Sequence, residues 1–146
     1  MNKYTPETDG VDHINVYSQG KTQLGRFLTN FANSPFICGD GEFQSVEGYW
    51  YWLSCTHPRK EELRKAYGFN AKKLGRELRA ADWVHTPEFK EKIKTAIACK
   101  VGGNLRMLNE LRRNTLPLRH YYVFGGKIVE DKRSQWILDF IQTLAT

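Results

Sequence analysis

The chain has few cysteines, no metal-binding spacing and no long apolar run, and each of these absences excludes a class of protein. Its 146 residues include three cysteines, Cys38, Cys55 and Cys99, with no C-x-x-C pair. An odd, scattered set of this kind is typical of reduced thiols in a cytosolic protein, not of a disulfide-stabilised secreted domain. The four histidines show no H-E-x-x-H spacing, so we expect no metal site.

Membrane and secretory segments are absent from the sequence pattern. No stretch approaches the ~20 apolar residues of a membrane-spanning helix, and the first ten residues lack the apolar core of a signal peptide. We therefore expect a cytoplasmic protein with no membrane partner. The segment Gly20-Lys21-Thr22 also lacks the upstream glycine of a P-loop, which excludes that class of nucleotide-binding protein.

The composition is that of a globular protein with a basic balance. Hydrophobic residues make up 40% of the chain and charged residues 26%. We expect a flexible polar arm over residues 1–12 and one domain over residues 13–146. The net charge of +6 favours an anionic partner, either nucleic acid, a nucleotide or a phosphosugar, without choosing among them.

The hydrophobic periodicity predicts an α+β fold, predominantly helical, with a small N-terminal sheet and a late β-hairpin. Capping residues mark several helix starts: Ser45, Thr86, Asn104 and Ser134, with Asn70 before a further helix. The predicted strands cover residues 13–18 and 35–38 and a hairpin over 119–129. The predicted helices cover residues 46–53, 58–67, 71–81, 87–101, 105–113 and 135–144.

The helix expected after Ser45 is unusually aromatic. Val46, Tyr49, Trp50 and Leu53 fall on one helical face, and Glu47 lies in the first turn just off that face. A core helix with one exposed acid explains this pattern. The alternative is that the Glu47 carboxylate lies at the edge of an aromatic surface that binds the flat ring of a ligand, on which the carboxylate acts.

A second helix, expected over residues 71–81, is strongly basic. Its apolar face is flanked by four cations: Lys72, Lys73, Arg76 and Arg79. Gly75 within this helix costs about 1 kcal/mol relative to alanine. We therefore expect another part of the chain to approach the helix closely at Gly75.

The order of these segments resembles the NADAR or YbiA-like family over roughly residues 14–140. No single segment is specific for the family, but their combined order is. The matching segments are Leu28-Thr-Asn-Phe31, Pro35-Phe36, Asp40-Gly41, Ser45-Val-Glu47, Ala71-Lys-Lys-Leu-Gly-Arg76, Trp83 and the run Lys100…Asn104…Leu108…Thr115.

The resemblance implies cleavage of an N-glycosidic bond in an NAD-derived or ADP-ribosylated nucleotide, without a cofactor. Such a reaction builds positive charge on the ribose, which a nearby carboxylate stabilises. Glu47 matches the family's carboxylate. The implied ligand is a small nucleotide or an ADP-ribosyl group, including one carried on nucleic acid. The residues expected to bind it are Asn30 at the ribose, Lys72 and Arg76 at phosphates, Trp50 and Trp83 at a base, and also His120.

The chain departs from the family pattern E-H-Y-x-Q-A-x-K in three places. Gly48 replaces the histidine, Tyr51 the glutamine and Ser54 the lysine. The family's downstream acidic segment is replaced by residues 118–126. The catalytic set is therefore incomplete unless another side chain stands in. The candidates are Lys72, His120, Glu130 and Asp131.

Three functions remain open on this evidence: an N-glycosidase, an inactive ADP-ribose or nucleotide binder, and a basic module that binds nucleic acid or a host factor. The segment His120-Tyr-Tyr-Val-Phe-Gly-Gly-Lys127 is similar to short relatives from large tailed bacteriophages, which implies the host cytoplasm as its location.

Overall fold

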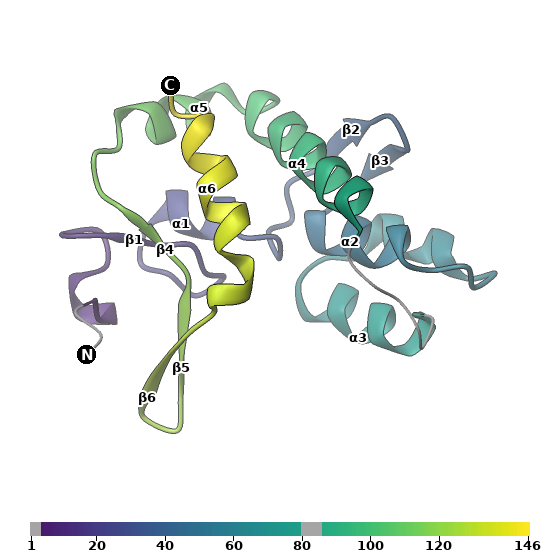
Figure 1. Ribbon diagram of the computed structural model, residues 1–146, viewed down its shortest axis with the longest axis horizontal. Coiled ribbons are helices and arrows are strands. Elements are labelled where there is room, and N and C mark those ends of the chain that lie inside the picture. Colours follow the sequence, from purple (N-terminus) through teal and green to yellow (C-terminus); the bar gives the residue numbers. More distant parts are fainter. Residues whose placement is uncertain (1–3, 80–85) are drawn as a thin grey trace. The chain divides into compact units, whose positions relative to one another are not determined.

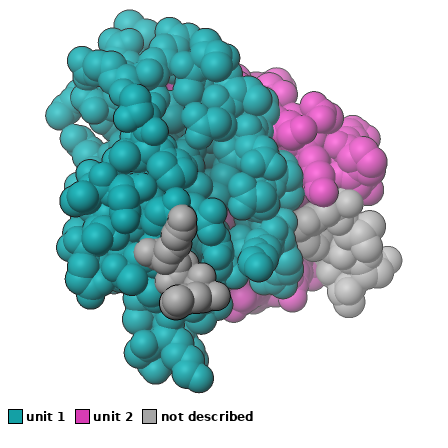
Figure 2. All heavy atoms as spheres, turned by 60° about the vertical axis from the view of Figure 1, so that its left-hand side comes forward, with its two compact units in different colours: residues 1–29, 104–146 teal, residues 30–103 magenta. Residues whose placement is uncertain are grey.

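The computed structural model describes residues 4–79 and 86–146. The chain forms two compact units (Figure 2). The first unit contains residues 1–29 and 104–146, and the second contains residues 30–103. The predicted fold class is confirmed, because helices dominate and the sheets are small (Figure 1). No helix in the described parts of the chain has the length and apolar character needed to cross a membrane.

The first unit contains a parallel strand pair and the late hairpin. Strand β1 pairs with β4, and β5 pairs with β6 in antiparallel register around Gly125 and Gly126. Both glycines have positive φ, 58° and 76°, which suits a tight two-residue turn. The elements of this unit are η1 (Pro6–Thr8), β1 (Ile14–Asn15), α1 (Gln23–Leu28), α5 (Leu105–Arg113), β4 (Leu118–Arg119), β5 (Tyr121–Phe124), β6 (Lys127–Glu130), η3 (Lys132–Ser134) and α6 (Gln135–Thr143).

The second unit is built around the aromatic helix α2. Phe43 is fully buried, and its ring lies 4.7 Å from Tyr49 and 5.5 Å from Trp52 between ring centroids. The buried residues Ile93 and Ile97 contribute the apolar face of α4. The elements are β2 (Phe36–Cys38), β3 (Gly41–Phe43), α2 (Val46–Leu53), η2 (Lys60–Lys65), α3 (Gly68–Leu78) and α4 (Pro87–Gly102).

Three predicted helix starts are confirmed by their caps. The side chain of Ser45 accepts a hydrogen bond from the Gly48 N–H, and Thr86 and Asn104 cap α4 and α5 in the same way. In each case the capping residue precedes a segment whose apolar face is buried. The capping hydrogen bond and the burial of the apolar face therefore favour the same starting residue in each of these three helices.

Two other local predictions are wrong, and a third is confirmed only in part. Helix α3 begins at Gly68 and not after Asn70, because Gly68 adopts φ 59° and its N–H donates to the Phe31 carbonyl at 3.1 Å. The helix predicted over 58–67 is the shorter 3-10 segment η2. Ser134 occupies the predicted N-cap position of α6, but it makes no side-chain capping bond, since its hydroxyl donates to the Asp131 carboxylate at 3.4 Å.

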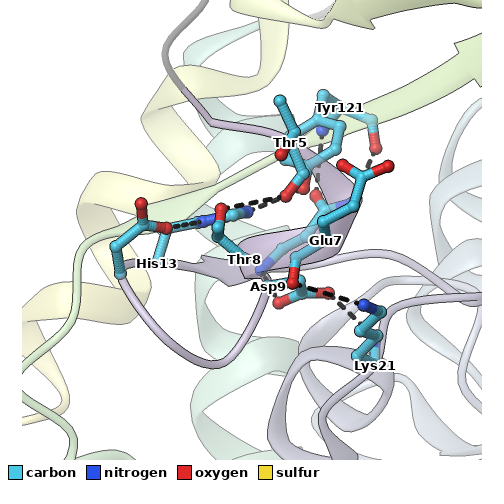
Figure 3. Close-up of polar contacts among 9 residues, drawn as sticks. Thr5, Glu7, Thr8, Asp9, His13, Lys21 and Tyr121 are labelled. Atoms are coloured by element: carbon cyan, nitrogen blue, oxygen red, sulfur yellow. Dashed lines mark hydrogen bonds and ion pairs between the residues drawn. The ribbon is translucent and has the colours of Figure 1, made fainter.

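Buried polar contacts organise the start of the chain (Figure 3). Asp9, in the segment expected to be a polar arm, is buried and accepts hydrogen bonds from the Asn15 and Lys21 N–H groups at 2.9 and 2.8 Å. His13 is fully buried, and its Nε2 lies 2.7 Å from the Tyr121 hydroxyl. This network joins the N-terminal segment to β1 and β5.

The side chain of Asn15 forms hydrogen bonds to β5 of the kind that the backbone of a neighbouring strand would form. Its side-chain amide donates to the Tyr121 carbonyl, and its side-chain oxygen accepts from the Tyr121 N–H, both at 3.0 Å. Both residues are buried. The amide therefore satisfies two main-chain groups that water does not reach.

We predict that Asn15→Ala lowers the free energy of unfolding by about 2 kcal/mol or more, because it leaves two buried backbone groups of Tyr121 unpaired. Urea unfolding measures the change. Asn109→Ala, on an exposed position of α5, is the matched control and should stay within about 0.5 kcal/mol of wild type. Equal stabilities for the two variants would contradict the role of Asn15.

Candidate functional site

Glu47 lies in the first turn of α2, where the helix start holds it in place. The Ser45 hydroxyl accepts from the Gly48 N–H at 3.0 Å and donates to the Ala66 carbonyl at 2.8 Å. The Glu47 N–H donates to the Asn30 carbonyl at 2.9 Å. Glu47 is half-buried, and these hydrogen bonds fix the backbone that carries its side chain.

Burial and charge act on Glu47 in opposite directions. Removal from water raises the pKa of its carboxyl group from the ordinary 4.5 to about 7, although the positive charges of Lys72 and Arg76 act to lower it. Burial is the larger effect. A carboxyl group with a pKa near neutrality exchanges a proton easily at physiological pH, which suits general acid or base chemistry.

Helix α3 approaches α2 closely at Gly75, as the sequence predicts. A Cβ atom at Gly75 would lie 2.0 Å from Cγ of the Tyr51 ring. Tyr51 is 7% exposed and packs in a cluster with Cys55, Leu63 and Leu78. The missing side chain at Gly75 therefore admits the aromatic ring.

Tyr51 also lies in this cluster, although in the sequence it stands out only as a departure from the family pattern. Burial raises the pKa of its hydroxyl, and the charge of Glu47 raises it further, while Arg76 lowers it. The hydroxyl thus shares the electrostatic environment of Glu47 and Arg76. Its position four residues after Glu47, on the same side of a helix, is the signal that identifies it.

Asn30 carries an unsatisfied polar atom beside this cluster. Across residues 4–79 and 86–146, its Oδ1 is the one buried side-chain nitrogen or oxygen with no hydrogen-bond partner. Buried polar atoms are nearly always paired, so an exception calls for an explanation such as an absent ligand. The oxygen is an acceptor, which suits a ligand hydroxyl or N–H group.

The predicted site residues therefore divide into groups. Asn30, Glu47, Lys72 and Arg76 come together in the second unit. Trp50 is half-buried in the same unit, with its ring 4.8 Å from Phe89 in edge-to-face contact. His120 belongs to the first unit, where its Nδ1 lies 2.7 Å from the Val16 carbonyl. Trp83 lies outside the described residues.

Packing explains two of the departures from the family pattern. A Cβ atom at Gly48 would lie 2.4 Å from the Leu63 carbonyl oxygen, so that a histidine does not fit there. Ser54 is buried, and its hydroxyl donates to the Tyr51 and Trp50 carbonyls at 3.1 and 3.3 Å. The residues of η2 thus occupy space that the family's histidine would need.

The proposed substitutes for the family's acid have other contacts in the first unit. Glu130 forms an ion pair with Arg119, and Asp131 accepts a hydrogen bond from the Arg133 N–H at 3.0 Å. Within the described residues, no group of three or more His, Cys, Asp or Glu side chains is arranged to hold a metal ion.

A surface pocket of about 420 Å³ lies along the basic side of α3. It is lined by Phe69, Asn70, Lys72, Lys73 and Arg76. Lys72 and Arg76, which act on the Glu47 carboxyl group, thus also line an open space large enough for part of a nucleotide.

Comparison with solved structures finds a known protein with a similar fold. The E. coli protein YbiA, whose structure was determined by NMR, superposes with a TM-score of 0.67 over 92% of this chain and 83% of that one. The chain has the YbiA fold. The two sequences are 16% identical, so the likeness concerns the fold and confirms that part of the resemblance. No protein-family model and no curated protein sequence matches the chain.

We predict that Gly75→Ala destabilises the protein by about 1–3 kcal/mol, because the added methyl group collides with the Tyr51 ring. In an open helix the same change stabilises by up to about 1 kcal/mol. Gly102→Ala, at a position with no atom within 4 Å of the added Cβ, is the control and should not lose stability. Thermal or urea unfolding distinguishes them, and a stabilised Gly75→Ala variant would exclude this contact.

A second prediction concerns pH. The folded protein binds the Glu47 proton more tightly than the unfolded chain does, so that stability from this group is present at low pH and is lost as pH rises through about 7. Wild type should therefore lose about 2 kcal/mol relative to Glu47→Gln between pH 5 and 8, less than the full shift implies because water reaches the half-buried group.

Urea unfolding of both proteins across this pH range tests the prediction. Glu88→Gln, which removes an exposed first-turn acid of α4, controls for the loss of one negative charge. A constant difference in stability between wild type and Glu47→Gln at every pH would show that folding does not raise the pKa of the Glu47 carboxyl group.

Proposed function

We propose that the chain is an N-glycosidase that cleaves the bond between a ribose and a nitrogen base in an NAD-derived or ADP-ribosylated nucleotide. The observation that carries the proposal is that Glu47, whose carboxyl pKa is raised to about 7, lies within the electrostatic influence of the α3 cations Lys72 and Arg76, with its N–H bonded to the carbonyl of Asn30. The likeness in fold to YbiA agrees with the family resemblance from which this reaction is inferred.

Each group has a distinct task in this proposal. Lys72 and Arg76 bind the phosphates, and the planar guanidinium group of Arg76 is able to contact two phosphate oxygens at once. Asn30 Oδ1 accepts a hydrogen bond from a ribose hydroxyl. The ribose is then held between the phosphates and Glu47, with its anomeric carbon facing the carboxyl group.

The reaction breaks the bond between C1′ of the ribose and the base nitrogen. The electron pair of that bond stays on the nitrogen, and positive charge develops on the ribose. A nicotinamide then leaves neutral without a proton, whereas an amine nitrogen of a base takes up the proton that Glu47 removes from water. Ionised Glu47 stabilises this charge and accepts a proton from the attacking water, whose oxygen bonds to C1′. The products are the free base and a ribose with a hydroxyl at C1′.

A nucleotide binder without catalytic activity is the second candidate, and a specific observation favours it. Gly48 and Ser54 replace the histidine and lysine of the resembled family pattern, and both positions are closed by packing. The binder keeps Lys72, Arg76 and Asn30 but lacks the complete catalytic set.

We predict that Glu47→Gln abolishes turnover but leaves ligand affinity within a few-fold of wild type. The amide preserves the shape of the side chain but accepts no proton from water. The test incubates wild type and the variant with NAD, ADP-ribose and a guanine-linked ADP-ribose, measures binding by thermal shift, and identifies products by mass spectrometry.

The outcomes separate the candidates. Cleavage by wild type that disappears in Glu47→Gln supports the N-glycosidase, and the product identifies the bond. Retained turnover in the variant rules out the role of Glu47. A thermal shift with every ligand intact identifies a binder. Absence of any shift, together with salt-dependent DNA binding that is insensitive to Glu47, indicates a nucleic-acid-binding module.

A further inference from the structure

Phe69 is an exposed aromatic residue in the first turn of α3, and its position is unusual for a large apolar side chain. It exposes 67% of its surface. The Phe69 ring packs edge-to-face against Phe31: the two ring centroids lie 5.1 Å apart, and the ring planes meet at 77°. Phe69 thus offers an open aromatic surface that is nevertheless held by a neighbour.

The backbone holds this aromatic pair next to the candidate site. The Gly68 N–H donates to the Phe31 carbonyl at 3.1 Å, and the preceding carbonyl, of Asn30, accepts from the Glu47 N–H at 2.9 Å. Two consecutive residues therefore connect the start of α3 to the start of α2. Phe69 is fixed relative to both Asn30 and Glu47.

Positive charge lies beside the open aromatic ring. Phe69 lines the same pocket as Lys72, Lys73 and Arg76. Among the described residues no side chain caps the N-terminus of α3, so the amide groups of its first turn add to the positive potential of these three cations. A ligand that fills the pocket meets a flat apolar surface and an anion-binding surface together.

We propose that Phe69 is the base-stacking residue of this site, and that a nucleoside diphosphate binds with its base on the Phe69 ring and its phosphates on the three pocket cations, Lys72, Lys73 and Arg76. The inference rests on the proposed function and specifies how its substrate is held. Inorganic phosphate alone would not use the ring, and an apolar peptide would not need three cations. Trp50, the residue expected to stack, has its ring against Phe89.

The test uses two probes, ADP and inorganic pyrophosphate, whose affinities are measured by calorimetry with the full chain. Phe69→Ala should weaken ADP binding about 10-fold, because it removes one base–aromatic contact, and leave pyrophosphate binding within about two-fold. Phe69→Trp should restore ADP affinity. Lys73→Ala should weaken both probes, because both carry phosphates.

Phe124→Ala is the matched control, since Phe124 is 76% exposed and lies in the other compact unit. Its affinities should equal those of wild type. Unchanged ADP binding by Phe69→Ala, an equal loss for both probes, or no binding of ADP by wild type would each overturn the proposal.

The assay also separates this inference from the proposed function. With saturating substrate, Phe69→Ala should retain the kcat of wild type while its KM rises, whereas Glu47→Gln loses kcat. Loss of turnover in Glu47→Gln together with unaltered KM in Phe69→Ala would leave the glycosidase standing and exclude the stacking role.

Discussion

The contact between Gly75 of α3 and the ring of Tyr51 in α2 is the constraint on which the candidate site depends. No other amino acid leaves room for the ring at this distance. Because the two helices are so close, Arg76, the residue after Gly75, and Lys72, three residues before it, act on the carboxyl group at the start of α2. A larger residue at position 75 would push α3 away from α2 and so separate Lys72 and Arg76 from Glu47.

The positive charges of α3 do not fully offset the cost of burying an ionised Glu47, and this affects how the site binds an anion. Burial outweighs the attraction of Lys72 and Arg76, so the pKa of the carboxyl group stays near 7. A phosphate bound to those cations would compete with the carboxylate for their charge. Binding of an anionic ligand and ionisation of Glu47 are therefore linked, each altering the free energy of the other.

Features determined by neighbouring residues could be predicted from the sequence. Ser45, Thr86 and Asn104 cap helices as expected, and Gly75 marks a close approach. The fold class follows from the same local patterns. The start of α3 could not be predicted this way, because it depends on a hydrogen bond from Gly68 to Phe31, 37 positions earlier in the chain by residue number.

Only part of the candidate site could be predicted from the sequence. Glu47, Lys72, Arg76 and Asn30 follow from motif order, and the structure brings them together. The unpaired state of Asn30 Oδ1 and the exposure of Phe69 depend on packing between distant segments, for which a single sequence carries no periodic signal.

The side-chain amide of Asn15 pairs with the backbone of Tyr121 across 106 positions of the chain. Residues 30–103 lie between these partners and form a compact unit of their own. During synthesis, this unit has all its residues before the ribosome has made Tyr121. The N-terminal segment therefore meets Tyr121 only after residues 30–103 have been made, and forming this contact closes a long loop.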